Sequence, residues 1–235
     1  MLKLILSFLI VSSLLCSETI SVIVPCHYKH FKHVEELMDN LNLQSRLPDE
    51  VVISLSQSNE IPIHEITKFE SLKYPFAIKF IKNEGVLFAG MNRNIACDNA
   101  IGDIFITQDA DDVPHQQRLE IIEYFFSKYD VDHIIHRWKP THGYRSDEYF
   151  GYLNEKDVEF YFMQRSWDKD IFDYITNGNI AIRREVFEKV RWGNLFIGED
   201  VDFNNHVFEF SRKTIVLNAF LLIYRQELSS YSCSR

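Results

Sequence analysis

The chain has 235 residues, of which 46% are apolar and 14% aromatic, and its formal net charge at pH 7 is −9. This length and apolar content are enough for one sizeable hydrophobic core and exclude an intrinsically disordered chain. The negative charge argues against nonspecific nucleic-acid binding, which needs a basic surface. A nucleotide ligand stays possible, because a metal ion can carry the phosphate charge.

The N-terminal residues 1–17 differ from the rest of the chain. Lys3 precedes an apolar run, and the small residue Ser17 stands at a plausible cleavage point. The run is roughly 12 residues long, which is short for a membrane span and typical of a signal-peptide core. We therefore expect a signal peptide or short signal anchor, with an N-terminal strand or helix of the domain as the alternative. Residues 18–235 contain no repeat or linker and are expected to form a single domain.

The four cysteines, Cys16, Cys26, Cys97 and Cys233, lack the spacing of a metal site or of a recognisable disulfide framework. Removal of a signal peptide would leave three of them. A bond from Cys233 to Cys26 or Cys97 is an alternative, but we expect buried free thiols.

Strands and helices alternate through the first half of the chain. Short apolar runs predict strands at 21–25, 51–56, 76–81 and 104–108. Apolar residues at helical spacing predict helices at 33–43, at 85–100 and from Pro114 onward, where proline suits a first helical turn. This alternation implies βαβ units, so the expected fold class is α/β, with a mostly parallel central sheet flanked by helices.

The regularity fades after Asp130. Residues 131–177 are rich in aromatic and charged side chains without a clear period, and could form either an acceptor platform or core. Further on, the patterns predict strands at 178–182, 214–216 and 220–224 and helices at 184–190 and 199–210.

Three carboxylates in four positions, Asp109, Asp111 and Asp112, follow the apolar run 104–108. Alternate residues of a strand share a face, so Asp109 and Asp111 can aim at one point. Such a cluster stays ionised cheaply only beside a cation, and oxygen ligands favour Mg²⁺ or Mn²⁺ over zinc or copper. Ligands of open α/β sheets bind beyond the carboxyl ends of the strands. The cluster therefore predicts a metal-bound phosphate ligand, with a solvated acidic turn as the alternative.

Five segments carry further patterns: SVIVPCHY at 21–28, NEG to MNRN at 83–94, GDIFITQDADDVP at 102–114, GNIAIRREVF at 178–187 and GEDVDF at 198–203. In this order and spacing they resemble family 2 glycosyltransferases, and the resemblance covers nearly everything after residue 18. It implies a GT-A fold, a Rossmann-like fold of nucleotide-diphospho-sugar transferases. Residues 18–130 would then form the nucleotide-sugar-binding half and 131–235 the acceptor-binding half.

The resemblance also implies an activity, namely metal-dependent, inverting sugar transfer from a nucleoside diphosphate sugar to a hydroxyl group. A UDP-sugar is the default donor. Asp111, in a DxD motif, would hold Mn²⁺ or Mg²⁺ with Asp109 and Asp112 nearby, and Asp109 could instead reach the ribose or sugar. The cation would offset charge on the leaving diphosphate. Asp200 would be the catalytic base, and Glu199 would position the acceptor. Without the upstream motifs, both would be read as ordinary acids of a helix N-terminus.

The donor-binding residues that the resemblance implies are Pro25, Cys26, His27, Tyr28, Ser54, Ser56, Asn83, Arg93, Asn94 and Asp109. Gly178 and Asn179 would join Glu199 on the acceptor side. Many family members carry an aspartate near the base where the second strand here ends with serines. Tyr28 or His27 could stack on the base. Arg93 could neutralise the diphosphate, brace the acidic loop or form a plain surface salt bridge. His206 could supply a third metal ligand, although ordinary packing is the expected role.

Two other functions fit parts of the sequence. A phosphotransferase of the haloacid dehalogenase type would use Asp109 as its nucleophile, although that motif normally ends the first strand and here follows the fourth. A catalytically silent sugar- or nucleotide-binding protein on the same fold is the second alternative.

The expected partners are a nucleotide-sugar donor and a glycan, glycoprotein or glycolipid acceptor, without nucleic acid. The N-terminus could bring the chain close to a membrane. The signal-like residues 1–17 favour the ER or Golgi lumen, where nucleotide sugars are available. A membrane-tethered or cytoplasmic enzyme is the alternative if this segment is not a signal.

Overall fold

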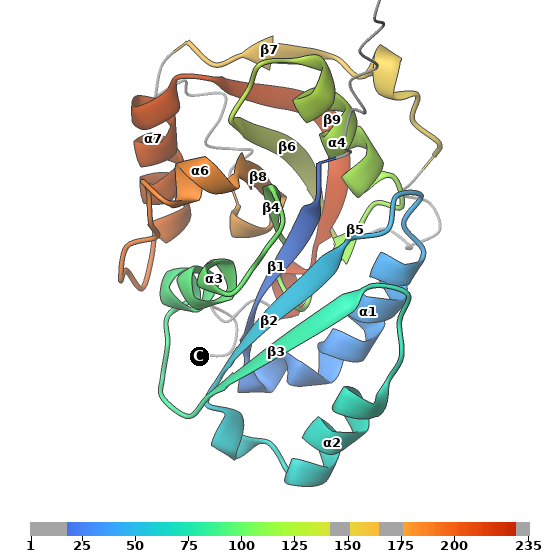
Figure 1. Ribbon diagram of the computed structural model, residues 1–235, viewed down its shortest axis with the longest axis vertical. Coiled ribbons are helices and arrows are strands. Elements are labelled where there is room, and N and C mark those ends of the chain that lie inside the picture. Colours follow the sequence, from blue (N-terminus) through green and yellow to red (C-terminus); the bar gives the residue numbers. More distant parts are fainter. Residues whose placement is uncertain (1–17, 142–150, 165–175, 229–235) are drawn as a thin grey trace, which may run out of the picture.

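The computed structural model describes residues 18–141, 151–164 and 176–228. These residues form a twisted sheet with helices on both faces (Figure 1). The strands are β1 (Ile20–His27), β2 (Glu50–Ser56), β3 (Ala77–Asn83), β4 (Ile104–Thr107), β5 (Val113–Pro114), β6 (His133–Pro140), β7 (Phe160–Phe162), β8 (Ile180–Arg183) and β9 (Thr214–Tyr224). The architecture confirms the α/β class expected from the sequence.

The helices are α1 (Val34–Asn42), α2 (Ile63–Ser71), α3 (Ala89–Asp98), α4 (Arg118–Lys128), α6 (Arg184–Phe187) and α7 (Glu199–Ser211). Short 3-10 turns are η1 (Tyr28–His33), η2 (Ser58–Glu60), η4 (Glu155–Asp157), η5 (Asn177–Asn179) and η6 (Gln226–Leu228).

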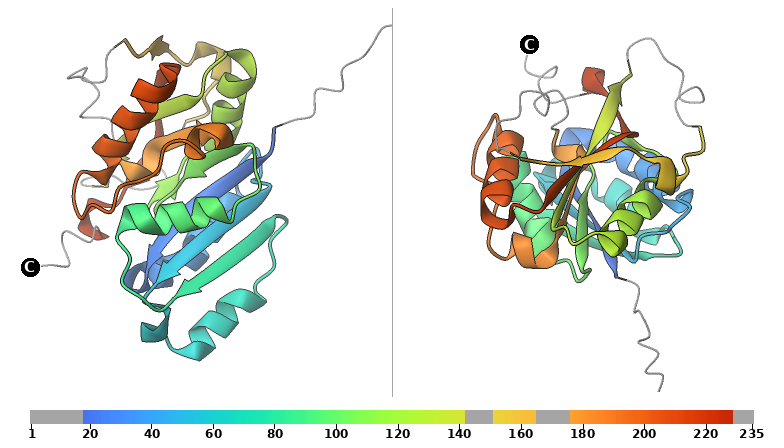
Figure 2. Two further views of the ribbon diagram at one scale, coloured as in Figure 1. Left: turned by 60° about the vertical axis from the view of Figure 1, so that its left-hand side comes forward. Right: turned by 90° about the horizontal axis from the view of Figure 1, so that it is seen from above.

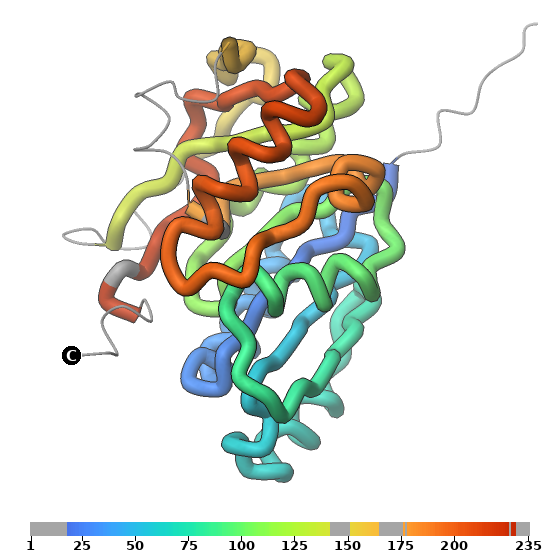
Figure 3. The backbone as a smooth tube through the Cα atoms, turned by 90° about the vertical axis from the view of Figure 1, so that its left-hand side faces the viewer, coloured from blue at the N-terminus to red at the C-terminus, as the bar shows by residue number. Residues whose placement is uncertain are grey.

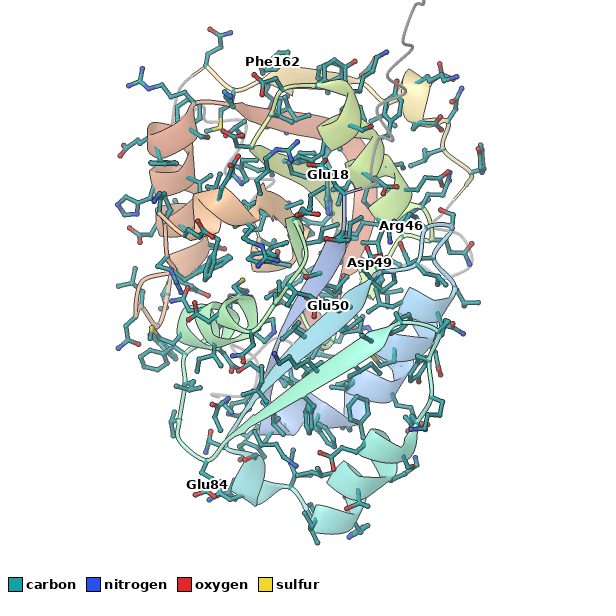
Figure 4. The ribbon with its side chains drawn as sticks, viewed as in Figure 1. Glu18, Arg46, Asp49, Glu50, Glu84 and Phe162 are labelled. Carbon is teal, nitrogen blue, oxygen red and sulfur yellow. The ribbon has the colours of Figure 1, made fainter. Side chains whose placement is uncertain are left out.

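The strand order is β3-β2-β1-β4-β8-β6-β9-β5, with β7 paired to β9. The first four strands in this order are parallel, so their carboxyl ends lie at one edge. Figure 4 places Arg46 and Asp49 before the start of β2, toward the opposite end from Glu84, which follows β3. β8 runs antiparallel to β4, so the start of β8 lies beside the end of β4. β9 is parallel to β6, and β5 pairs antiparallel with β9.

The central strands β1, β2, β4 and β8 are buried on both faces, and side-chain alternation divides the core in two. Val22 and Val24 point to the face covered by α1, α2 and α4. Ile23 and Val52 point to the face covered by α3, α6 and α7. Figure 2 shows the two helix groups on opposite sides of the sheet, and Figure 3 shows α3, α6 and α7 across one side. The loops that lead from the carboxyl ends of the strands into helices on both faces therefore lie along the carboxyl edge.

The helix predicted from Pro114 is wrong in its start, because Val113–Pro114 form β5 and the helix begins at Arg118. Pro114 pairs with Leu222 of β9, and β5 ends the strand order. A terminal strand tolerates proline because one side of its ladder needs no N–H donor. This long-range pairing overrides the local preference of proline for a first helical turn.

Other boundaries also differ from the sequence-based expectations. α3 begins at Ala89, later than expected. The two strands predicted near the C-terminus are one continuous strand, β9. The stretch 131–177 contains β6 and β7, which the sequence did not predict because its apolar residues show no regular period there.

Within the described residues, no helix is long and apolar enough to cross a membrane. The predicted leader at 1–17 lies outside those residues, as do Cys16 and Cys233. Cys26 of β1 and Cys97 of α3 are free and buried, which confirms the expectation of buried thiols for this pair.

Burial raises the pKa of both the Cys26 and the Cys97 thiol above the ordinary value for cysteine. We expect that neither thiol of a Cys16→Ser/Cys233→Ser protein reacts with Ellman's reagent near about pH 8, because only the thiolate attacks. Both should react after unfolding in guanidinium. Fast reaction of a thiol in the folded protein would contradict the placement of β1 and α3.

Candidate active site

The three carboxylates lie in a short loop, residues 108–112, at the carboxyl end of β4. Gln108 closes this acidic loop, because its Nε2 donates to the backbone oxygens of Asp109 at 3.0 Å and Asp112 at 3.1 Å. Gln108 is buried, and its Oε1 accepts from Arg118 Nη1 at 2.6 Å. The loop is thus held from beneath as well as within itself.

Arg118, the first residue of α4, is the buried brace of the acidic loop. Its Nη2 donates to the backbone oxygens of Thr107 at 2.8 Å and Gly178 at 2.6 Å. Its Nε donates to His136 Nε2 at 2.9 Å, which requires a neutral imidazole. Burial, together with the Arg118 charge, lowers the pKa of His136 well below its ordinary value. Burial also lowers the pKa of Arg118 to about 9, an effect that Asp109 and Asp112 oppose.

Arg93 of α3 joins the acidic loop to the start of α7. Its Nη2 lies 2.6 Å from Asp109 Oδ1, and its Nη1 lies 3.6 Å from Glu199 Oε1. The Arg93 side chain is only 2% exposed. Burial raises the pKa of the Glu199 carboxyl, and the Arg93 charge opposes that rise. Of the roles considered for Arg93, these contacts match bracing of the acidic loop rather than a surface salt bridge.

Asp112 is 1% exposed, and one of its two carboxylate oxygens lacks a hydrogen-bond partner among the described residues. Its Oδ1 accepts from the backbone N–H of Arg225 at 2.8 Å, whereas Oδ2 is the unpartnered atom. Burial, followed by repulsion from Asp109 and Asp111, raises the pKa of Asp112 well above its usual range. A Cβ atom on Gly178 would lie 3.4 Å from Asp112 Oδ2 and equally far from Asp109 Oδ2. These carboxylate oxygens therefore converge beside a glycine.

Asp111 makes a separate contact with the turn that follows β1. His30 of η1 donates from Nδ1 to Asp111 Oδ2 at 3.0 Å. This hydrogen bond raises the pKa of His30 above its ordinary value. The His27 ring lies 4.6 Å from the Tyr28 ring and 6.2 Å from the His30 ring, and His27 Nε2 lies 2.9 Å from Gln57 Oε1. Of the predicted base-stacking residues, Tyr28 thus lies in the same turn as His30, and His27 directly precedes that turn at the end of β1.

Several predicted donor-site residues lie inside the structural framework. Ser54 is buried, bonds to Asn92 Oδ1 and accepts from Asn83 Nδ2 at 3.0 Å. Asn92 Nδ2 donates to the Cys26 backbone oxygen at 3.1 Å. These contacts fix the carboxyl ends of β1, β2 and β3 against α3. Ser56 is also buried, and its hydroxyl lacks a hydrogen-bond partner among the described residues.

The remaining donor-side residues follow the same pattern. Pro25 lies within β1. Asn94 donates from Nδ2 to the Trp192 backbone oxygen at 2.9 Å and accepts from the Trp192 N–H at 3.1 Å. Asn94 thereby holds the segment that leads to α7.

The start of α7 is fixed by close packing against α3. Trp192 stacks on Phe203 with ring centroids 3.6 Å apart. A Cβ on Gly90 would come within 2.9 Å of the Gly193 backbone oxygen, so only glycine allows this approach without movement. Asp200, which follows Glu199, is half-buried, and its Oδ1 accepts from the next backbone N–H at 2.8 Å.

The other candidates are distributed around this centre. Asn179 is buried, donates to the His136 backbone oxygen and accepts from the Thr176 N–H at 2.9 Å. His206 lies on α7 with a 58% exposed side chain, 3.5 Å from Asp202. The structure thus places His206 on a surface pair. Of the aromatic stretch, Tyr144, Tyr149, Phe150 and Trp167 lie outside the described residues.

Within the described part of the chain, no three His, Cys, Asp or Glu side chains are arranged to hold a metal ion on their own. The acidic loop instead offers carboxylate oxygens that substrate phosphates could complement, as is usual for Mg²⁺ sites. Of the residues that meet at the acidic loop, the sequence indicated the three aspartates, Arg93 and Glu199. It missed Arg118 and His30, whose partners lie far away in the sequence.

We expect Arg118→Met to reduce the free energy of unfolding by about 3–5 kcal/mol, because it leaves buried polar partners and repelling carboxylates uncompensated. Lys128→Met, an exposed position at the other end of α4, is the matched control and should cost less than about 0.5 kcal/mol. Urea denaturation of the two metal-free variants measures the difference. Equal stabilities would show that Arg118 is not the brace of the loop.

Residues 21–191 match Glycosyl transferase family 2. An uncharacterized glycosyltransferase of Methanocaldococcus jannaschii is 26% identical over 209 residues, which cover 88% of this chain and 70% of that protein. Glycosyltransferase GlyA of Streptococcus pneumoniae is 24% identical over 229 residues, which cover 93% of this chain but only 32% of the relative.

Two solved structures of glycosyltransferases have a similar fold. Staphylococcus aureus TarS in complex with UDP-GlcNAc has a TM-score of 0.72 at 18% identity, covering 92% of this chain and 61% of the TarS chain. The mannosyltransferase PcManGT from Pyrobaculum calidifontis, in complex with GDP-Man and Mn²⁺, has a TM-score of 0.62 at 14% identity and covers 88% and 56%. At such identities the likeness shows the GT-A fold alone. With the family match over most of its length, the chain belongs to glycosyl transferase family 2.

Proposed function

We propose that the chain transfers a sugar from a nucleoside diphosphate sugar to an acceptor hydroxyl, with inversion and with the help of Mn²⁺ or Mg²⁺. A UDP-sugar is the default donor. The observation that carries this proposal is the acidic loop, where oxygens of Asp109 and Asp112 converge beside Gly178 and Arg93 links the loop to Glu199. The ligands of the fold neighbours, UDP-GlcNAc in TarS and GDP-Man with Mn²⁺ in PcManGT, support it.

The residues of the acidic loop fit a divalent cation. Asp112 Oδ2 is buried without a hydrogen-bond partner among the described residues, and it lies with Asp109 Oδ2 close to one point beside Gly178. The donor atoms are carboxylate oxygens, which hard cations prefer. When bound, the cation would supply positive charge against the diphosphate leaving group. Asp111 would hold it, with Asp109 and Asp112 nearby, while Arg93 keeps Asp109 oriented.

Asp200 is the proposed base for the attacking hydroxyl. It lies at the start of α7, next to Glu199, which Arg93 ties to the donor-side loop. A base on the acceptor side takes the proton as the hydroxyl attacks the anomeric carbon opposite the leaving group, which inverts its configuration. The family match ends at Arg191, so this role depends on the resemblance of 198–203 and on the geometry.

The acceptor and the compartment are proposals from sequence. The acceptor would be a glycan, glycoprotein or glycolipid in the ER or Golgi lumen. The segment that suggests this compartment, residues 1–17, lies outside the described residues.

Asp200→Asn should lower transfer by about 10²–10⁴-fold, the usual worth of a positioned base, while leaving donor binding unchanged. Asp202→Asn on the same helix is the control, because Asp202 pairs with exposed His206, and it should retain activity. A donor-panel transfer assay gives the rates, and proton NMR of the anomeric centre gives the configuration. Normal transfer by Asp200→Asn would refute the base, and a retained configuration would refute inversion.

Asp111→Asn should weaken nucleotide binding at least about tenfold in the presence of Mn²⁺, because a metal-bound carboxylate is lost. Binding without the metal should change little. Calorimetric titration with UDP and with GDP, each with and without Mn²⁺, measures both quantities. If Mn²⁺ does not strengthen nucleotide binding to the unaltered protein, metal dependence is wrong.

A further inference from the structure

His30 contacts the acidic loop through Asp111. It belongs to η1, the turn directly after β1, and its Nδ1 lies 3.0 Å from Asp111 Oδ2. The two side chains are 14% and 10% exposed. The His27 ring, itself 2.9 Å from Gln57 through Nε2, lies edge-on to the His30 ring at 6.2 Å. The imidazole is therefore held in place and directed at one aspartate.

The distance between these two atoms suits a shared cation as well as a hydrogen bond. Neighbouring ligands of an octahedral cation with bonds of about 2.1 Å are separated by about 3.0 Å. His30 Nδ1 and Asp111 Oδ2 already have this separation. A cation set off the line between the two atoms could thus bind both, once Nδ1 has lost its proton and the imidazole has turned toward the metal, while the backbones of η1 and the acidic loop stay in place.

We infer that His30 Nδ1 and Asp111 Oδ2 are two protein ligands of the donor's divalent cation. The inference rests on the proposed function and adds to it a nitrogen ligand from η1. Because the described residues offer no cluster of three metal-binding side chains, the other positions would be taken by diphosphate oxygens and water, as is common for cations that bridge protein and phosphate.

The nitrogen ligand has a consequence for metal choice. Carboxylate, phosphate and water suit both Mg²⁺ and Mn²⁺, whereas an imidazole ligand adds affinity for first-row transition metals and little for Mg²⁺. The site therefore prefers Mn²⁺ or Co²⁺ over Mg²⁺ when a nucleoside diphosphate is bound. Removal of His30 should reduce this preference, because an oxygen-only site remains.

Pulsed electron paramagnetic resonance of Mn²⁺ with UDP or GDP tests the inference without any turnover. The full chain is expected to show a nitrogen coupling to Mn²⁺, which changes when histidine is labelled with ¹⁵N. His30→Ala should lose this coupling and bind Mn²⁺ at least about 10-fold more weakly, because even an outer-shell partner of a metal ligand is worth about 10–100-fold, with little change for Mg²⁺. His33→Ala is the matched control, since His33 lies in the same turn 4.0 Å from Glu36, and it should keep both.

The outcomes separate this inference from the proposed function. Mn²⁺ that binds with the nucleotide but without a histidine coupling, or with a coupling that survives in His30→Ala, would overturn the ligand role of His30 alone. In that case His30 only hydrogen-bonds Asp111, and metal dependence stands. If Mn²⁺ does not bind with either nucleotide, both the ligand role and metal dependence fail. The labelling experiment uses the unaltered protein, so it does not depend on the folding of a variant.

Discussion

Repulsion among Asp109, Asp111 and Asp112 is the constraint on which the site depends. Two like charges 4 Å apart cost about 4 kcal/mol at an effective dielectric constant of 20, so this loop needs positive charge nearby. Arg93 comes from α3 on one face of the sheet, and Arg118 comes from α4 on the other. The sheet thus positions two buried guanidinium groups beneath the same loop. A bound cation would add the charge on the open side.

The topology explains how distant segments meet at this loop. Because β8 is antiparallel to β4, it starts where β4 ends, and η5 delivers Gly178 to the carboxylates. Pairing of β5 with β9 brings the backbone N–H of Arg225 to Asp112. The second half of the chain therefore completes a site begun by the first.

Much of this arrangement could be predicted from sequence, and the failures have a physical cause. Apolar runs identified the parallel strands, and the aspartates after β4 identified the edge where a ligand should bind. Pro114 misled the helix prediction because its pairing partner, Leu222, is far away in the sequence. Arg118 and His30 carry no local signal, since each matters only through contacts that the fold creates. The hydrogen bonds of Ser54 to Asn92 and Asn83 are likewise contacts that the sequence does not indicate.

The central claim is that a divalent cation joins the acidic loop to the diphosphate of the donor. A crystal structure of the chain soaked with Mn²⁺ and a nucleoside diphosphate tests it most directly, through the anomalous scattering of manganese. We predict an anomalous peak within bonding distance of Asp111 and of the diphosphate oxygens. A bound nucleotide without such a peak, with the three aspartates directed away from its phosphates, would contradict the account.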